Sequence, residues 1–400
     1  MPEADVVVTR LKALLAIIAV SAIFHSNLSF GAVLPEDRVD VLYHAYDGGG
    51  ADISGPSVLV RKSFADTISV YGNYYVDMVT SASIDVVFAG ASTYTEERTE
   101  YSVGFDYLYD KTIMSLSYSN SSESDYDAET IGFGISQDFF GDLTNVSLGF
   151  SYGSDIVGRN GTVNPVDGSN KVGEAEHRRY SLGISQIVTK NLLVALNFET
   201  VIDEGFLNNP YRSIRHLDPT TVDPNDTVLE PELYPETRNS DAFSIKALYY
   251  LPYRASIRGE YRTFGDSWGI NADSLEFRYT HPIEAWNVIL EGKLRFYKQN
   301  QADFYSDLFP FANGNGVEFR ARDKEMSDFG TTTFGLGASY EIPPGIIPFF
   351  DKSSVNLYWD HIQLDYDNFL DATQTGVAPG SEDPYSFNAN VIRLFFSFWY

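Results

Sequence analysis

The chain has 400 residues, no cysteine, a formal net charge of -27 and 15% aromatic residues. The missing cysteines exclude disulfides, thiolate metal sites, c-type haem attachment and a thiol nucleophile. So acidic a chain is not expected to bind nucleic acid, because the phosphates would be repelled. A mean hydropathy of -0.18 with many aromatic residues suits a chain that presents one face to lipid and the other to water.

The N-terminus has the pattern of a cleaved secretory signal peptide over residues 1–31. Two basic residues precede the apolar run from Ala13 to Phe24, and small residues follow it. A transmembrane helix needs about 20 apolar residues, more than this run contains. We therefore predict export, with cleavage after Gly31 or, as the second choice, after Ala32, and a mature chain of residues 32–400.

Beyond the signal peptide, apolar and polar residues alternate in segment after segment. Alternating segments of about ten residues are the sequence signature of a transmembrane β-barrel. The strands of a soluble sandwich alternate too, but they are usually about five or six residues long. One face of each segment is apolar or aromatic and the other is small or polar, most clearly in residues 101–109, 114–119, 143–152, 253–262 and 287–296.

The connections between these segments are short and long in turn, as in barrels with tight periplasmic turns and long extracellular loops. This asymmetry favours a membrane barrel over a soluble sheet. The short connections are near residues 110–111, 141–142, 190–191, 251–252 and 281–285. The long connections are residues 154–176, 203–239, 300–326 and 365–384.

The strand number follows from counting hairpins from both ends of the chain. Residues 40–47 and 57–64 pair across Gly48, Gly49 and Gly50, and the turns define further hairpins up to residue 365. We predict an all-β fold, a single transmembrane antiparallel β-barrel of about 16 strands, an even number as in bacterial single-chain barrels. If residues 40–64 instead form a plug or a periplasmic arm, the number is about 14.

The last segment of the chain is aromatic at alternate positions and ends in an aromatic residue. Leu394, Phe396, Phe398 and Tyr400 share one face. The segment resembles the terminal strand by which the barrel-assembly machinery accepts outer-membrane proteins. That machinery and outer-membrane lipid are therefore expected partners, and an ordinary C-terminal strand is the alternative.

A distinctive block of sequence covers residues 74–86 and continues at residues 94–98, with further blocks at residues 55–62 and 107–112. These blocks resemble a proteobacterial family known only as domain of unknown function 3570. The resemblance implies an outer-membrane β-barrel and supplies no catalytic residue. Because members of that family are often considered beside small lipoproteins and redox proteins, it also implies a small lipoprotein or a redox protein of the envelope as a partner. Nothing in the sequence indicates a cofactor.

Residues 77–99 are the least barrel-like part of the N-terminal half. They mix apolar and small residues with a charged run. One interpretation is that this segment folds inward and narrows or gates the lumen; the other is an ordinary extracellular loop. The candidates for the gate are Asp77, Met78, Asp85, Glu96, Glu97 and Arg98.

A second candidate is a strip of basic residues on the inward faces of neighbouring strands. A line of charge along a pore sets ion selectivity, so this strip could attract anions. The favoured interpretation is a ladder of cross-strand ion pairs with nearby glutamates, which keeps the interior neutral and wet. The strip consists of Lys246, Arg254, Arg258, Arg262, Arg278, Lys293 and Arg295.

The loop from Asp203 to Asn239 is rich in carboxylates, the oxygen ligands that calcium prefers. It has no EF-hand spacing, so solvated surface charge is favoured over a calcium site and no metal is expected. A hydrolase would need a histidine beside an acid or a serine at the barrel rim. His177 and His216 are placed in long acidic loops, and alternation puts Asp360 and His361 on opposite faces, so an enzyme is not expected.

These observations predict a porin-like barrel in the bacterial outer membrane. It would pass or bind a small solute or ion, or house an envelope partner in its lumen or at its mouth. The alternative is a non-conducting scaffold or adhesin whose long acidic loops bind partners.

Overall fold

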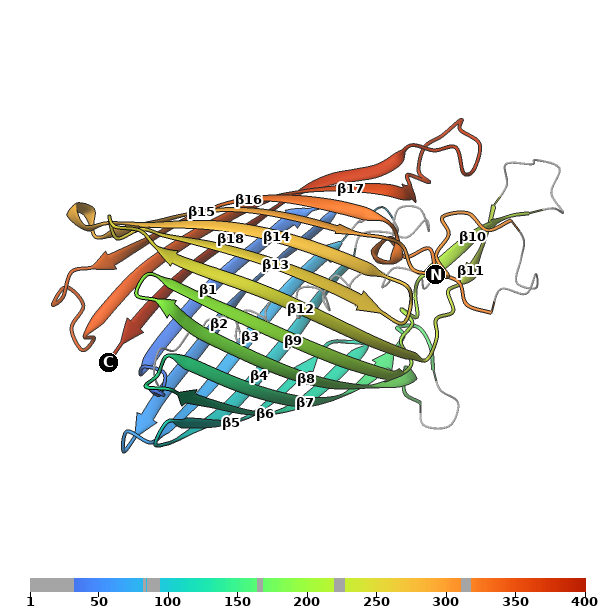
Figure 1. Cartoon of the computed structure of the whole chain (residues 1–400). Helices are drawn as coiled ribbons and strands as arrows, with labels where there is room; N and C mark the ends of the chain where they lie inside the picture. The colour runs from blue at the N-terminus through green and yellow to red at the C-terminus, as the bar shows by residue number, and fades with distance from the viewer. Residues whose placement is uncertain (1–31, 82–83, 85–93, 164–167, 219–226, 311–317) are drawn as a thin grey trace.

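The computed structural model describes residues 32–81, 84, 94–163, 168–218, 227–310 and 318–400. The expected signal peptide and its cleavage point lie outside these residues, apart from Ala32. Within the described residues, sixteen strands form one closed antiparallel barrel, and two more form a separate hairpin at one end (Figure 1). The predicted all-β barrel is confirmed.

The strands of the barrel wall are long, from 11 residues in β5 to 19 in β8 and β17. Such strands exceed the length that a bilayer core needs, about 9 to 11 residues, so several project beyond the membrane. In chain order the wall consists of β1 (Arg38–Gly48), β2 (Ala51–Phe64), β3 (Ile68–Ser81), β4 (Tyr94–Tyr109), β5 (Thr112–Ser122), β6 (Tyr126–Phe139), β7 (Thr144–Gly158), β8 (Lys171–Thr189), β9 (Leu192–Gly205), β12 (Thr237–Tyr250), β13 (Ser256–Asp266), β14 (Asn271–Ile283), β15 (Val288–Gln299), β16 (Phe329–Ile342), β17 (Lys352–Leu370) and β18 (Pro384–Trp399). The separate hairpin consists of β10 (Ser213–Leu217) and β11 (Thr227–Pro231).

The barrel closes where β1 pairs with β18, in an unbroken register from Arg38 opposite Trp399 to Gly48 opposite Ala389. On its other side β1 pairs with β2 across the turn at Gly49 and Gly50. Both glycines have a positive φ, which L-residues with a side chain adopt only with strain. The first two strands therefore belong to the wall, and the alternative of about 14 strands with a plug or periplasmic arm is wrong.

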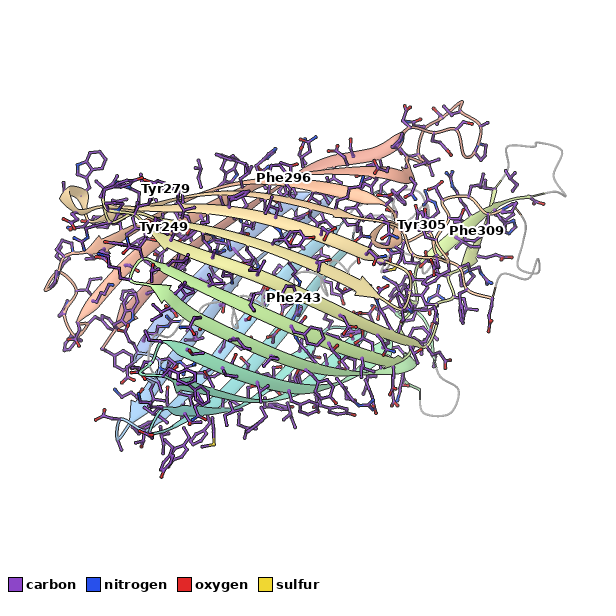
Figure 2. The ribbon with its side chains drawn as sticks, in the orientation of Figure 1. Phe243, Tyr249, Tyr279, Phe296, Tyr305 and Phe309 are labelled. Atoms are coloured by element: carbon purple, nitrogen blue, oxygen red, sulfur yellow. The ribbon has the colours of Figure 1, made fainter. Side chains whose placement is uncertain are left out.

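Alternation divides each wall strand between two environments. Apolar and aromatic side chains cover the outer surface, among them Phe243, Tyr249, Tyr279 and Phe296, which Figure 2 labels along the wall. An aqueous protein would hide side chains of this kind in its core, whereas here lipid can cover them. No helix in the described part of the chain is long and apolar enough to cross a membrane.

The two ends of the barrel differ as expected, but the long loops are shorter than predicted. For example, β7 continues to Gly158 and β8 begins at Lys171. Much of the predicted loop of residues 154–176 is therefore strand. His281, expected in a turn, lies on β14, and the turn follows at a short 3-10 helix, Glu284–Trp286. Strand pairing thus continues beyond the membrane wherever alternation persists.

The described parts of three loops at the long-loop end fold together into a structure that we call the cap: residues 206–218 and 227–236, which carry β10 and β11, residues 300–310 and 318–328, and residues 371–383. Figure 1 shows these loops beyond one end of the wall, opposite the C-terminus. The molecule's packed apolar core lies at this end rather than inside the barrel. It contains Trp268, Tyr305 and Phe369, each buried.

The two faces of β7 provide a test of which side meets lipid. Leu148 is 54% exposed on the outer face, opposite Ile135 and Leu182, and Ser147 beside it faces the lumen. We expect Leu148→Arg to lower the free energy of unfolding in lipid vesicles by about 2–4 kcal/mol, because the charge enters hydrocarbon, and Ser147→Arg to cost much less. Urea unfolding in vesicles measures both. Equal losses would contradict the orientation of the wall.

Candidate functional site: a polar lumen beneath a cap

The inner wall of β5 to β8 is lined by small residues, a region that we call the small-residue sector. A Cβ added at Gly149 would lie 2.5 Å from the Ser181 hydroxyl oxygen, and one at Gly183 would lie 2.5 Å from that of Ser147. A side chain at either glycine would therefore collide with the serine hydroxyl of the neighbouring strand. The sector comprises Ser115, Ser117, Ser119, Gly132, Gly134, Ser147, Gly149, Ser151, Ser181, Gly183 and Ser185.

The predicted gate residues are divided between the two faces of the wall. Asp77 and Arg98 occupy paired positions on β3 and β4 and are buried on the lumen side. Met78 and Glu97, one position along, are exposed on the outer face, so their assignment to the lumen is wrong. Both ends of the 77–99 segment are barrel strand, whereas the prediction treated the whole segment as loop or insert.

The remaining gate candidates are at or near the connection between β3 and β4. Glu96 is half-buried on the lumen side of β4, and Asp85 lies outside the described residues. Ile84 is 8% exposed and belongs to the apolar cluster of the cap. Ile84 therefore packs against the cap.

Six of the seven predicted basic residues face the lumen. Arg254 does not: it lies exposed in the turn before β13 and pairs with Glu284 at the short-turn end, so its place in the strip is wrong. Five of the six pair with carboxylates of neighbouring strands, as the ladder interpretation requires. These pairs are Lys246–Glu260 at 3.2 Å, Arg258–Glu276, Arg262–Glu199 at 3.4 Å, Arg278 with Glu276 at 3.1 Å and Glu291 at 2.8 Å, and Lys293–Asp360 at 2.7 Å.

A histidine held between two carboxylates in the lumen is not found from the sequence, which suggests a loop for His177. His177 lies on β8, with Nε2 3.0 Å from Asp155 of β7 and Nδ1 2.7 Å from Asp203 of β9. Because both ring nitrogens are held by carboxylates, neither is available as a general base. The signal for His177 in the sequence is the alternation of β8, which begins at Lys171 and includes this residue.

The loop of residues 206–236 crosses the mouth of the barrel, because it contacts connections on both sides of its own strands. On one side the Tyr211 hydroxyl donates to Asp125, between β5 and β6, and accepts from the backbone N–H of Asn160, 2.7 Å away between β7 and β8. On the other side Arg215 binds Glu382, between β17 and β18. β5–β6 and β17–β18 lie far apart around the wall.

Buried arginines hold the cap together. Arg215 is 2% exposed and pairs with Asp307 and with Glu382, whose carboxylate is 2.5 Å from Nη1. Arg322 pairs with the other oxygen of Asp307 at 2.9 Å. Buried ion pairs persist only where both partners are fully satisfied, so the loss of one arginine leaves uncompensated carboxylates. Alternation does not point to these arginines; their signal in the sequence is positive charge inside otherwise acidic loops.

An apolar cluster lies beside this network. Tyr234 contacts Trp268 and Phe304, with both pairs of ring centroids 5.4 Å apart, and Trp268 contacts Phe304 at 5.3 Å. Figure 2 labels Tyr305 and Phe309, which belong to the same loop as Phe304 and lie at this end of the molecule. Packed aromatic rings exclude water, so this part of the mouth is filled by protein.

One carboxyl group in the cap is buried beside another. Glu232 accepts hydrogen bonds from the Arg322 backbone N–H at 2.6 Å and from the Tyr234 hydroxyl at 2.5 Å. Burial, together with the nearby Asp323 carboxylate, raises the pKa of Glu232 to about 7, although Arg212 opposes the shift. Its carboxyl group therefore titrates near neutral pH inside the cap.

Within the described part of the loop from Asp203 to Asn239, several acidic residues face basic side chains. Glu204 pairs with Arg178 at 2.8 Å, and Glu230 lies 3.5 Å from His216. The structure gathers acids elsewhere: ligand oxygens of Glu96, Glu123 and Asp125 lie within 4.8 Å of one another. Glu96 accepts a hydrogen bond from the Ser124 backbone N–H at 3.2 Å, and Asp125 accepts one from Tyr211.

The terminal strand presents the face that its sequence predicts. Leu394 pairs with Tyr43 and Leu357, and both of these are exposed on the outer surface. Phe396 and Phe398 follow on the same face. The Tyr400 hydroxyl donates to the Arg61 carbonyl at 3.0 Å, and the Lys62 ammonium lies 4.8 Å from the centre of its ring. The chain end is therefore fastened to β2 at the short-turn end.

A family model described as "Protein of unknown function (DUF3570)" matches residues 87–348. The chain belongs to this family. The resemblance seen in the sequence blocks is thus confirmed, and a comparison with the curated proteins gives no match.

Solved outer-membrane structures are similar to this barrel at low identity. A bacterial polysaccharide outer membrane secretin has 7% identity and a TM-score of 0.48, over 92% of this chain and 100% of that chain. Outer-membrane expressed OmpT of Vibrio cholerae has 10% identity and a TM-score of 0.40, over 92% and 100%. OccD3 (OpdP) of Pseudomonas aeruginosa has 9% identity and a TM-score of 0.43, over 92% of each chain. These likenesses concern the barrel, and no function is transferred from them.

The titration of Glu232 makes cap stability depend on pH. An opened cap returns this carboxyl to water, where its pKa is near 4.5. Because the closed cap holds the proton more tightly, its stability is greatest below pH 4.5 and falls as pH rises through about 7, by on the order of 3 kcal/mol. We expect hydrogen exchange of the cap amides to speed up between pH 5 and pH 8, after correction for intrinsic rates.

Glu232→Gln, which copies the protonated carboxyl, should remove most of this pH dependence and keep the cap protected at pH 8. The matched control is Glu204→Gln, in a half-exposed pair with Arg178. If the Glu232→Gln protein keeps the full pH dependence, Glu232 is not its source.

Proposed function

We propose that this protein is a capped, porin-like barrel that binds a small polar solute or ion in its lumen and passes it when the cap opens. The observation that carries the proposal is the buried Arg215 network, which ties together loops from distant parts of the mouth above a polar, charged lumen. A cap of this kind regulates access to the space beneath it. The N-terminal signal pattern and the outer-membrane type of barrel support a location in the outer membrane, with the cap on the extracellular side.

The lumen supports passage or binding of a polar solute. A barrel of about 16 strands is wide enough for an aqueous channel unless it is filled. Serine hydroxyls line one sector, and paired charges line β12 to β17 opposite it. A purely structural interior would favour apolar packing, because buried ion pairs stabilise a fold little.

The second candidate is a scaffold or adhesin with a closed lumen, or a barrel that houses an envelope partner. The observation that favours it is the hairpin of β10 and β11, which extends from the cap (Figure 1) and exposes Val228 and Leu229. A scaffold of this kind needs the cap as a rigid platform and never needs it to open.

Conductance in planar bilayers separates the two candidates. Arg215→Ala leaves Asp307 and Glu382 without one of their arginines, a loss of about 3–5 kcal/mol for a broken buried pair. If the cap gates a pore, the variant should spend a much larger fraction of time in conducting states than the wild type. The wall strands contain none of the three residues, so the barrel should remain resistant to SDS at low temperature.

Arg254→Ala is the matched control, because it removes an exposed arginine and its ion pair from the opposite end of the barrel. Its conductance should equal that of the wild type. A folded Arg215→Ala barrel that passes no more current than the wild type would reject the gated pore and leave the scaffold.

A further inference from the structure

Two guanidinium groups on the inner wall share one carboxylate, and a third faces the same lumen. Arg179 of β8 and Arg262 of β13 both contact Glu199 of β9, Arg262 at 3.4 Å. Arg295 of β15 faces the same lumen, and no ion pair joins it to a carboxylate within the described ranges. Its neighbour across β14, Glu276, is already bound by Arg258 and Arg278. The three arginines therefore carry two positive charges that Glu199 does not balance.

The cluster lies directly beneath the cap. Tyr297 lies near two of its members: it shares the row of Arg262, since Ser274 pairs with both, and it is two positions from Arg295 on β15. The Tyr297 hydroxyl donates to Gln299 at 2.6 Å, and the Gln299 amide donates at 2.9 Å to the backbone carbonyls of Glu325 and Ser327 in the cap. Arg262 and Arg295 therefore lie on the cap side of the lumen, in the path of a solute that passes the opened cap.

The lumen side of the surrounding wall also carries a net positive charge. With histidine counted as neutral, nine basic residues of β8, β12 to β15 and β18 face the lumen with seven carboxylates of β9, β13 to β15 and β17, an excess of two positive charges in a chain whose net charge is -27. The basic residues are Arg179, Arg238, Lys246, Arg258, Arg262, Arg278, Lys293, Arg295 and Arg393, and the carboxylates are Glu199, Asp203, Glu260, Asp266, Glu276, Glu291 and Asp360. The wall thus attracts anions although the molecule as a whole repels them.

We propose that Arg179, Arg262 and Arg295 form a binding site for a small anion with at least two negative charges, carried on carboxylate or phosphate groups. The planar guanidinium fork matches both groups and binds them through two parallel hydrogen bonds. The side chains of Arg179 and Arg262 are 33% and 39% exposed, so each keeps donors free of Glu199. The inference rests on the proposed function in one respect: it names the class of solute that the barrel passes.

Equilibrium titration of the full-length mature barrel in detergent tests the site without requiring transport. The probes are inorganic phosphate and succinate, added separately at constant ionic strength. Both should bind the wild type, or one alone if the site selects between phosphate and carboxylate. Affinity should fall at least about tenfold in Arg295→Gln and further in Arg262→Gln/Arg295→Gln, since a hydrogen bond to a charged group contributes that much.

The matched control is Lys298→Gln, which removes one positive charge from the outer face of β15, three positions from Arg295. It should bind both probes as the wild type does. Arg295→Gln leaves no carboxylate newly unpaired, so it should fold even if the double variant does not. The site is overturned if neither probe binds the wild type, if Arg295→Gln binds as tightly as the wild type, or if Lys298→Gln loses as much affinity.

Current measurements separate this inference from the proposed function. In the Arg215→Ala background a chloride-selective reversal potential should move toward zero when Arg295→Gln is added. Absence of any current in that background rejects transport, whereas the binding titration still decides the anion site.

Discussion

Backbone hydrogen bonding in hydrocarbon is the constraint on which the rest of this structure depends. An unpaired amide in the bilayer costs several kcal/mol, so a chain of strands must close on itself. Pairing of β1 with β18 satisfies both edges, and every wall strand then has two partners. Once the backbone is satisfied in this way, alternate side chains are free to specialise, with the outer set meeting lipid and the inner set meeting water.

The inner set is not uniform around the barrel. Serine and glycine line β5 to β8, whereas long charged side chains line β12 to β15, so the free space lies off the barrel axis and toward the small residues. Long arginines can extend into that space without an opposing side chain in their way. The apolar core is displaced to the cap, where Trp268 and Phe369 pack beside buried ion pairs. In the proposed function, the polar lumen conducts the solute and the packed cap closes the mouth.

Most of the barrel could be predicted because its rules are local. A period of two, tight turns at residues such as Asp110 and Gly141, and an aromatic last strand each follow from one stretch of sequence, and together they gave the correct strand number. The lengths of β7 and β8 were underestimated, because Asp155 and His177 look like loop residues and have their partners on neighbouring strands rather than nearby in sequence. The cap could not be predicted, because Arg215, Asp307 and Glu382 are far apart in sequence and no period links them. The basic strip was predicted only in part for the same reason, because its ion pairs join residues far apart in sequence. Alternation assigned the side chains to the lumen face, but only the strand register showed which carboxylates they share.

The loop of residues 206–236 contacts four other connections of the barrel, at Asp125, Asn160, Asp307 and Glu382. An element tied at so many points cannot loosen at one of them and stay in place at the others. The mouth should therefore behave as a cooperative unit with two states instead of widening by degrees. Under the proposed function, recordings from single barrels would then show full steps of current between two levels, and the duration of each closed step would report how long the central loop stays docked.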